Sequence, residues 1–257
     1  MNFDLDAYLT RIGHARVTPS AEALESLHEA HVRSIPFENL DVVMGTHAGI
    51  GLGVIQDKLV RRQRGGYCYE HGLLFAAALE ALGFTVERRM ARVQPDRPGP
   101  STHMMLVVRI GDDEFLADVG FGWGLLRSMP LRDQEIVDQS GWKYRLLQNG
   151  PWWRLQRFES DWTTLHQFGP EVRYQVDYEV GHHYVSTHPK SPFWEQIVVM
   201  RLEPGLSKRF VGNELILEYA DGRVEKSIVT RETLDETLRG LDVVVTPNEL
   251  AKIDTLR

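Results

Sequence analysis

The sequence predicts an α+β protein, because helix-like patterns fill its first part and strand-like patterns fill most of the remainder. Residues 1–84 carry helical periodicity, whereas residues 85–195 form a succession of short segments that resemble antiparallel strands. Residues 196–257 combine a strand hairpin with a helix. The strand succession further predicts a barrel or a strongly bent sheet in the middle of the chain.

Helices are expected at three places in residues 1–84. The first covers LDAYLTRIG, and the second covers SAEALESLHEAHVRSI, where Ser20 precedes the apolar pattern as an N-terminal signal. The segment PFENLD then interrupts the pattern, because proline cannot donate a helix hydrogen bond. The third helix is expected to begin near Cys68 and to end at Gly83, a residue type that suits a helix C-terminus.

Strands are expected from Thr85 onward, separated by turns rich in glycine, aspartate, asparagine and proline. The segments are TVERRMARV, HMMLVVRI, EFLADVGFG, WKYRLLQ, WWRLQRF, VRYQVDYEV and IVVMRLE. The end of the sequence predicts a hairpin across Asp221 and Gly222, followed by one helix that begins near Thr233.

The composition favours a soluble globular protein. Of the 257 residues, 42% are hydrophobic and 25% are charged, and no apolar run approaches the roughly 18 residues of a membrane-spanning helix. The start, MNFDLDAYLTRIGH, lacks the regions of a signal peptide, so a cytoplasmic location is expected. A net charge of −7 without basic blocks disfavours nucleic acid as a partner. A single cysteine excludes an internal disulfide and a zinc site built from cysteines.

That single cysteine, Cys68, lies in the segment RGGYCYEHG between two glycines and the third expected helix. In the first turn of a helix it would lie near the positive end of the helix dipole, which favours the thiolate form of cysteine. A free cysteine is nevertheless often only a small buried hydrophobic residue. A catalytic role therefore requires a base.

The register of one predicted hairpin supplies a base and an acid. If Gly111 and Asp112 form the turn between HMMLVVRI and EFLADVGFG, His103 becomes the diagonal neighbour of Asp118 on one face of the sheet. We expect Asp118 to accept the Nδ1 proton of His103, while Nε2 removes the proton of Cys68. The alternatives are a structural histidine with one hydrogen bond and an aspartate that caps the turn.

A metal site is not expected. His182, His183 and His188 are close in sequence, but neighbouring residues of a strand point to opposite faces of a sheet. Trp152 and Trp153 are expected to be one buried and one surface packing residue for the same reason.

Five segments in order resemble the arylamine N-acetyltransferase family. They are IPFENLD at 35–41, RGGYCYEHG at 64–72, THMMLVV at 102–108, DVGFG at 118–122 and STHPKSPF at 186–193. The resemblance implies a helical bundle over 1–84, a β-barrel over 85–195 and an α/β lid over 196–257. It also implies a Cys-His-Asp arrangement like that of the cysteine proteases.

The resemblance further implies roles for individual residues. Cys68 becomes the nucleophile, His103 the base and Asp118 the orienting acid. Other residues are implied to support the cysteine loop (Glu38, Arg64), to line an acceptor pocket (Phe37, Phe121) or to contact CoA (Ser101, Thr102, Gly122, Ser186, Thr187). The family commonly has asparagine where Gly72 stands in this sequence.

The reaction that the resemblance implies has two steps. Acetyl-CoA acetylates the cysteine, and the amine of an arylamine or arylhydrazine then takes the acetyl group, without a metal, a nucleic acid or a membrane. The alternatives are an amide synthase that closes a macrocyclic polyketide, a thiol hydrolase with the same three residues, and a binding protein without acceptor chemistry.

Overall fold

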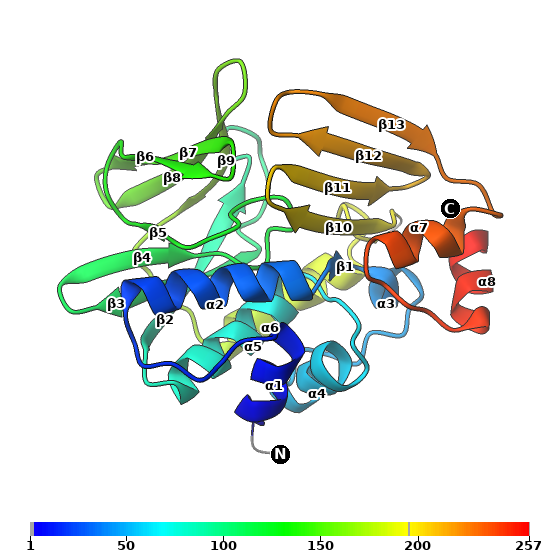
Figure 1. Cartoon of the computed structure of the whole chain (residues 1–257), viewed down its shortest axis with the longest axis horizontal. Coiled ribbons are helices and arrows are strands. Elements are labelled where there is room, and N and C mark those ends of the chain that lie inside the picture. Colours follow the sequence, from blue (N-terminus) through cyan, green and yellow to red (C-terminus); the bar gives the residue numbers. More distant parts are fainter. Residues whose placement is uncertain (1–2, 195, 257) are drawn as a thin grey trace.

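The computed structural model describes residues 3–194 and 196–256. Figure 1 shows two sheets side by side, with most of the helices below them. The helices are α1 (Leu5–Ile12), α2 (Ala21–Ser34), α3 (Leu40–Val43), α4 (Leu52–Gln56), the π-helix η1 (Asp57–Arg61), α5 (Cys68–Ala81), α6 (Gln175–Thr187), α7 (Leu234–Gly240) and α8 (Pro247–Thr255).

The larger sheet is antiparallel and curls into a nearly closed barrel, as the strand succession predicts (Figure 1). Its strand order is β5-β4-β3-β2-β9-β8-β7-β6. The strands are β2 (Thr85–Val93), β3 (His103–Ile110), β4 (Asp113–Ala117), β5 (Met129–Pro130), β6 (Ile136–Gln139), β7 (Trp142–Asn149), β8 (Trp152–Phe158) and β9 (Trp162–Phe168). Apolar side chains from most of these strands fill the barrel, so the barrel is a packed core.

The smaller sheet joins distant parts of the chain. Its order is β1-β10-β11-β12-β13, with β1 (Phe37–Glu38), β10 (Val198–Glu203), β11 (Leu206–Val211), β12 (Glu214–Tyr219) and β13 (Val224–Ile228). The short strand β1 comes from the helical part of the chain, and its Phe37 pairs with Met200 of β10. The predicted hairpin across Asp221 and Gly222 connects β12 to β13.

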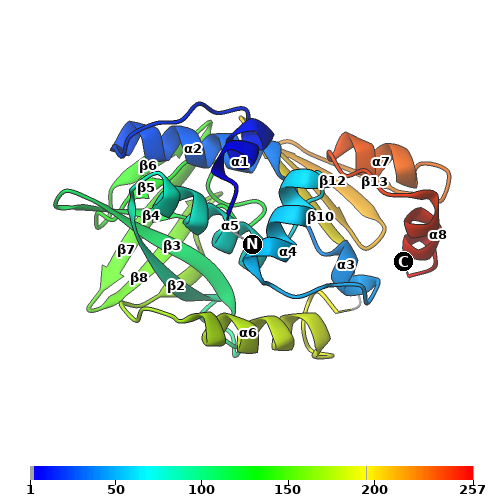
Figure 2. The same ribbon diagram turned by 90° about the horizontal axis from the view of Figure 1, so that it is seen from below.

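Helix α5 lies in the middle of the molecule, between the barrel strands and the other N-terminal helices (Figure 2). Its side chains are apolar and buried on nearly all sides, from Leu73 to Leu79. Gly72 lies against β3, and a Cβ atom there would come within 2.9 Å of the Met104 side chain. Methionine therefore fills the space in which the family's usual asparagine side chain would lie.

The helices α1, α2 and α5 and the α+β class are confirmed, but the prediction of a strand at VRYQVDYEV is wrong. That segment enters α6, where Tyr178, Gly181 and Val185 are buried at the spacing of a helix face. At the start of the helix, Asp177 accepts a hydrogen bond from the backbone N–H of Tyr174 at 2.9 Å. The alternating valine and tyrosine residues are typical of a strand with one buried face. In the helix, however, Val180 is exposed to solvent.

Two further expectations concern the domain boundaries and membrane-spanning helices. The boundary expected at residue 195 falls on a residue that lies outside the described ones, and the division into three parts stays a prediction. Within residues 3–194 and 196–256, every helix is too short or too polar to cross a lipid bilayer.

Candidate active site

Cys68 is the first residue of α5, and its side chain is almost completely buried. The thiol Sγ donates a hydrogen bond to the backbone oxygen of Thr102, at 3.8 Å. The chain enters the helix at Tyr67, whose backbone N–H donates to Oε2 of Glu70 at 3.1 Å. The thiol is thus placed at the positive end of a capped helix.

The glycines before Cys68 are required by close packing. A Cβ atom on Gly65 would lie 2.7 Å from Cγ of Glu38, and one on Gly66 would lie 2.8 Å from Oε2 of Glu70. Neither glycine has a positive φ, so a left-handed conformation is not the reason for glycine at these positions.

The DVGFG turn packs directly against the cysteine. A Cβ atom on Gly120 would lie 2.9 Å from Cα of Cys68, so only glycine allows this approach. Gly122 has a φ of +86°, and a Cβ there would meet Sδ of Met200 at 2.7 Å and Cγ of Phe37 at 3.1 Å. Met200 and Phe37 therefore fill the space beside the α-carbon of Gly122, and the expected contact of Gly122 with CoA stays a prediction.

His103 and Asp118 meet as the hairpin register predicts. Ile110 pairs with Asp113, which places His103 at the start of β3 and Asp118 one residue beyond β4. The ring is reversed relative to the expectation, because Nε2 of His103 donates to Oδ2 of Asp118 at 2.8 Å. Cys68 also acts electrostatically on His103, and Nδ1 is the ring nitrogen that Asp118 leaves available on that side. Strand register fixes which residues meet, but it does not fix the rotation of a ring.

The charged forms of His103 and Asp118 stabilise each other. Burial opposes the charged form of His103, but Asp118 and Cys68 together raise its pKa to about 10. Burial alone would raise the pKa of Asp118, yet the neighbouring His103 and His166 lower it. His103 can therefore hold a proton taken from the thiol while Asp118 stays ionised.

Two further histidines hold Asp118, and the sequence did not point to either. His166 of β9 approaches Oδ2 of Asp118 with its Nε2 at 3.1 Å. His28 of α2 accepts the backbone N–H of Asp118 at its Nε2, 3.1 Å away, while its Nδ1 donates to the oxygen of Leu126 at 3.0 Å. Burial lowers the pKa of His28 to about 4, so this histidine is neutral near pH 7.

The ligand-type atoms of His103, Asp118 and His166 lie within 4.8 Å of one another, which is close enough for a metal ion. Both histidines nevertheless direct Nε2 at the same oxygen of Asp118, and the raised pKa of His103 keeps its ring protonated near pH 7. A metal would have to displace these protons, so the arrangement favours hydrogen bonding over metal coordination.

The other histidine group lies on a helix. His182 and His183 belong to α6, so the strand argument used for them was wrong. Nδ1 of His182 is hydrogen-bonded to the hydroxyl of Tyr67, and its ring lies 4.6 Å from the ring of His47. These contacts place His182 in the packing around the cysteine loop.

A cavity of about 260 Å³ opens at the thiol. Cys68, Thr102 and His103 contribute its polar atoms beside the exposed tip of Lys190. Aromatic side chains form much of the remaining wall: Phe37, Phe121, Trp123, Tyr184 and Phe193. The two phenylalanines were predicted, whereas the other three aromatic residues were not. A cavity of this kind suits a flat apolar ring beside a reactive thiol.

Trp123 is held in this wall by two arginines. The guanidinium of Arg157 lies 4.8 Å from the centre of the Trp123 ring, and that of Arg209 lies 5.4 Å from it. Both arginines pair with Glu218, at 2.7 and 2.8 Å. The barrel and the smaller sheet therefore share one side chain of the cavity wall.

Among the expected CoA contacts, only Thr102 lines the cavity. The hydroxyl of Ser186 donates to the oxygen of His182 at 2.8 Å, and that of Thr187 donates to the oxygen of His183 at 2.6 Å. Both hydroxyl protons are therefore used within α6. Ser101 is half-buried and lies next to Thr102, outside the cavity wall.

Glu38 and Arg64 form a buried ion pair beside the cysteine loop. Nε and Nη2 of Arg64 both contact Oε1 of Glu38, at 3.1 and 3.0 Å, so one oxygen of the carboxylate makes both contacts. Oε2 of Glu38 instead accepts the N–H of Leu40 at 2.8 Å. Arg64 also reaches Asp41 at 3.3 Å and Glu249 of α8 at 3.1 Å.

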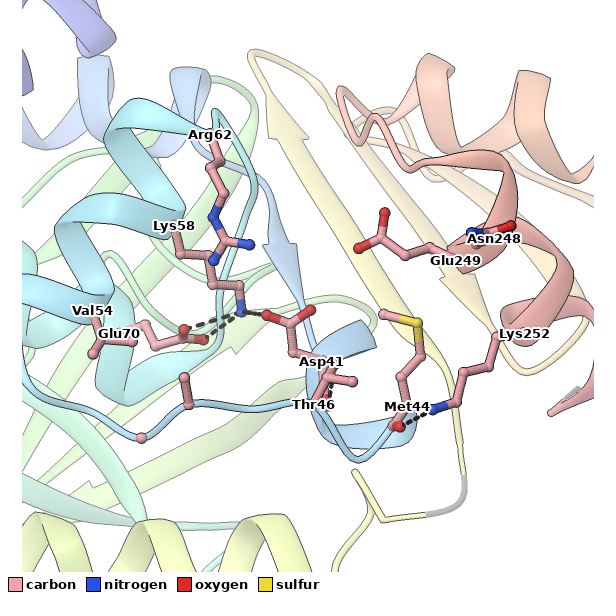
Figure 3. Close-up of a pocket in the computed structure, with 12 residues that line it drawn as sticks. Asp41, Met44, Thr46, Val54, Lys58, Arg62, Glu70, Asn248, Glu249 and Lys252 are labelled. Carbon is pink, nitrogen blue, oxygen red and sulfur yellow. Dashed lines mark hydrogen bonds and ion pairs between the residues drawn. The ribbon is translucent and has the colours of Figure 1, made fainter.

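A second cavity, of about 360 Å³, lies behind the cysteine helix (Figure 3). Inside it, Nζ of Lys58 binds Oε1 of Glu70 at 3.0 Å and Oδ2 of Asp41 at 3.2 Å. Burial alone would raise the pKa of Glu70, but Lys58 and His47 lower it to about 2. Glu70 is thus ionised and paired with Lys58, and it also caps the helix that begins at Cys68.

Comparisons with known proteins cover nearly the whole chain. A family model described as N-acetyltransferase matches residues 20–246. The chain is 36% identical to the arylamine N-acetyltransferase / N-hydroxyarylamine O-acetyltransferase of Salmonella typhimurium, over 87% of this chain and 82% of that protein. It is similar to the crystal structure of Nocardia farcinica arylamine N-acetyltransferase, with a TM-score of 0.92, 38% identity and coverage of 98% and 93%. It is also similar to the Mycobacterium marinum arylamine N-acetyltransferase in complex with CoA, with a TM-score of 0.90, 34% identity and coverage of 98% and 99%.

Proposed function

The chain belongs to the arylamine N-acetyltransferase family, and from that premise we propose that it moves an acetyl group from acetyl-CoA, through Cys68, to an arylamine or arylhydrazine. The observation that carries the proposal is the meeting of Cys68, His103 and Asp118 at an aromatic cavity. Membership of the family points to acetyl-CoA as the donor and an arylamine or arylhydrazine as the acceptor. The geometry points to Cys68 as the residue that carries the acetyl group between them.

In the first step Sγ of Cys68, whose proton already resides on Nδ1 of His103, attacks the carbonyl carbon of acetyl-CoA as a thiolate. The bond between that carbon and the CoA sulfur breaks, and the CoA thiolate takes the proton from His103. Asp118 stays ionised and holds the ring through Nε2. Cys68 then carries the acetyl group as a thioester.

In the second step the amine nitrogen attacks the thioester carbonyl, and His103 accepts the proton that the nitrogen loses. Sγ of Cys68 leaves as a thiolate, and the acetylated amine departs. The N–H groups of the first turn of α5 have no partner within the helix, so they are suited to stabilise the oxyanion in both steps. One cavity serves both substrates in turn, which predicts ping-pong kinetics.

The aromatic wall supports an aromatic acceptor. Phe37, Phe121 and Trp123 line the cavity beside Cys68, so an aromatic ring can pack against them while its amine reaches the thioester. Glu38 and Arg64 act on this reaction indirectly, by holding the loop before Cys68. A cytoplasmic location and the absence of a metal stay predictions from the sequence.

The experiment is mass spectrometry of the protein after brief incubation with acetyl-CoA alone. We expect one acetyl group on the Cys68 peptide, removable by mild hydroxylamine and by an added arylamine, and no acetylation of Cys68→Ala. Loss of the acetyl group to water at the same rate without amine would instead identify a hydrolase. A thiol that iodoacetamide modifies but acetyl-CoA does not would contradict acetyl-CoA as the donor and favour the amide synthase.

A further inference from the structure

We propose that His166 is a positioning residue for the catalytic residues, because it donates its Nε2–H to the same oxygen of Asp118 that holds His103. This inference deepens the proposed function and rests on it for the meaning of a change in turnover. The contact itself is a property of the fold, so part of its test requires no acyl donor.

The backbone of β9 aims His166 at Asp118. On the neighbouring strand β8, Leu155 pairs with His166, but the next residue, Gln156, pairs with Thr164. Leu165 is therefore an extra residue in β9, a β-bulge, and both Leu165 and His166 are buried. Bulges redirect side chains near active sites, and this one turns an imidazole toward the carboxylate.

The hydrogen bonds of the carboxylate assign the His166 tautomer. Oδ2 of Asp118 receives Nε2 of His103 at 2.8 Å and Nε2 of His166 at 3.1 Å, while Oδ1 receives the N–H of Gly120 at 3.3 Å. Because an ionised carboxylate only accepts, His166 must carry its proton on Nε2. Nδ1 of His166 is buried and has no hydrogen-bond partner among the residues that the structure describes.

The surroundings keep His166 neutral. The rings of Phe121 and Phe168 lie 5.6 and 5.9 Å from its own ring, and the ionisable groups that face it are His103 and Asp118. Burial lowers the pKa of His166, and Asp118 only partly opposes this effect. The positive charge therefore resides on His103, so His103 and not His166 accepts the proton of the thiol.

A purely structural residue at this position would more easily be apolar, since a histidine leaves a buried nitrogen without a partner. Its donor to Asp118 has two consequences for the reaction. The carboxylate cannot rotate away from His103, and its negative charge is shared between two donors. Without His166, the charge of Asp118 would act on His103 alone, so the imidazolium would be more stable and its ring less precisely oriented. Both effects slow the transfer of the Nδ1 proton to the leaving CoA sulfur.

The test compares His166→Phe, which keeps a ring but removes the donor, with His166→Gln, whose amide nitrogen replaces Nε2. We expect His166→Phe to lower the rate of Cys68 acetylation by about 10- to 100-fold, with little change in KM, as for other residues that orient catalytic ligands. We expect His166→Gln to restore most of this rate. Leu165→Ala, the matched control in the same bulge, lowers Tm but leaves the pH profile of acetylation unchanged.

Two outcomes would overturn the proposal. Equal losses in His166→Phe and His166→Gln would show that the ring acts only by packing, and an unchanged rate and pH profile in His166→Phe would show no role. If His166→Phe does not fold, ¹⁵N NMR of histidine-labelled wild-type protein decides the tautomer, and a proton on Nδ1 of His166 contradicts the proposal. Alkylation of Cys68 by iodoacetamide separates the two claims: a slower rate in His166→Phe supports this inference even if acetyl-CoA proves not to be the donor.

Discussion

Nη1 of Arg64 lies 3.1 Å from Oε1 of Glu249, and this ion pair joins α8 to the loop that precedes the nucleophile. Arg64 is almost fully buried, and its other contacts go to Glu38 and Asp41. The last helix therefore shares one guanidinium with the segment that sets the position of Cys68. The strength of this connection can be measured by removing either partner.

We expect Arg64→Ala to destabilise the protein by about 3–5 kcal/mol, because two buried carboxylates lose their partner. Glu249→Gln should cost about 1 kcal/mol or less, since the glutamate is partly exposed to solvent. Urea unfolding of both variants measures the difference. Equal effects of the two substitutions would contradict this ranking and show that the contact with α8 dominates.

A second prediction concerns the proton on His103. In Asp118→Asn the pKa of His103 should fall far below about 10, because the carboxylate opposes the effect of burial on this ring. Turnover should fall by up to about 10⁴-fold, as it does when the acid of a comparable catalytic triad is replaced by its amide. Ring ¹⁵N NMR follows the titration directly. An imidazolium that persists in Asp118→Asn near pH 9 would show that Cys68, and not Asp118, holds the charge.

The third prediction is a loss of stability in acid. The pKa of Glu70 is lowered in the fold from 4.5 to about 2, so its ionised form contributes stability above pH 4.5 that is lost as the pH falls toward 2. The shift corresponds to about 3 kcal/mol for this fully buried group. Unfolding free energies between pH 5 and 2 should therefore fall less steeply in Glu70→Gln than in the wild type. Parallel curves for the two proteins would contradict this assignment.

The fourth prediction tests why glycine stands at position 72. Gly72→Asn should destabilise the protein by about 1–3 kcal/mol, because its side chain would overlap Met104. The double variant Gly72→Asn with Met104→Ala should recover part of that loss. If the single variant is as stable as the wild type, Met104 can move aside, and the missing asparagine needs another explanation.

Much of the candidate site could be predicted because it lies on local patterns. The turn at Gly111 and Asp112 fixed which residues of β3 and β4 face each other, so His103 and Asp118 were identified together. The ring orientation of His103 was not accessible in this way, since it depends on donors around Asp118 from other strands. His166 was missed because its strand β9, WTTLHQF, was not among the predicted strands, and no sequence rule locates the bulge that turns the ring toward Asp118.

The remaining differences have the same physical origin. Tyr174, Val176 and Val180 have strand propensity, but the burial of Tyr178 and Val185 on one helix face decides the structure of α6. Glu249 was missed as a partner of Arg64 because 185 residues separate them in the sequence. Contacts between residues so far apart in the sequence depend on the whole fold, and the pattern of a short sequence segment does not predict them.

The pairing of Phe37 with Met200 determines when the cavity is completed during synthesis of the protein. During synthesis on the ribosome, the segment with Cys68 emerges long before β10, so the cavity lacks one wall while the thiol already exists. A nascent chain of this kind exposes a cysteine that the finished protein covers. The thiol is therefore exposed before His103 and Asp118 have been made, and it gains its reactivity only when these residues fold against it.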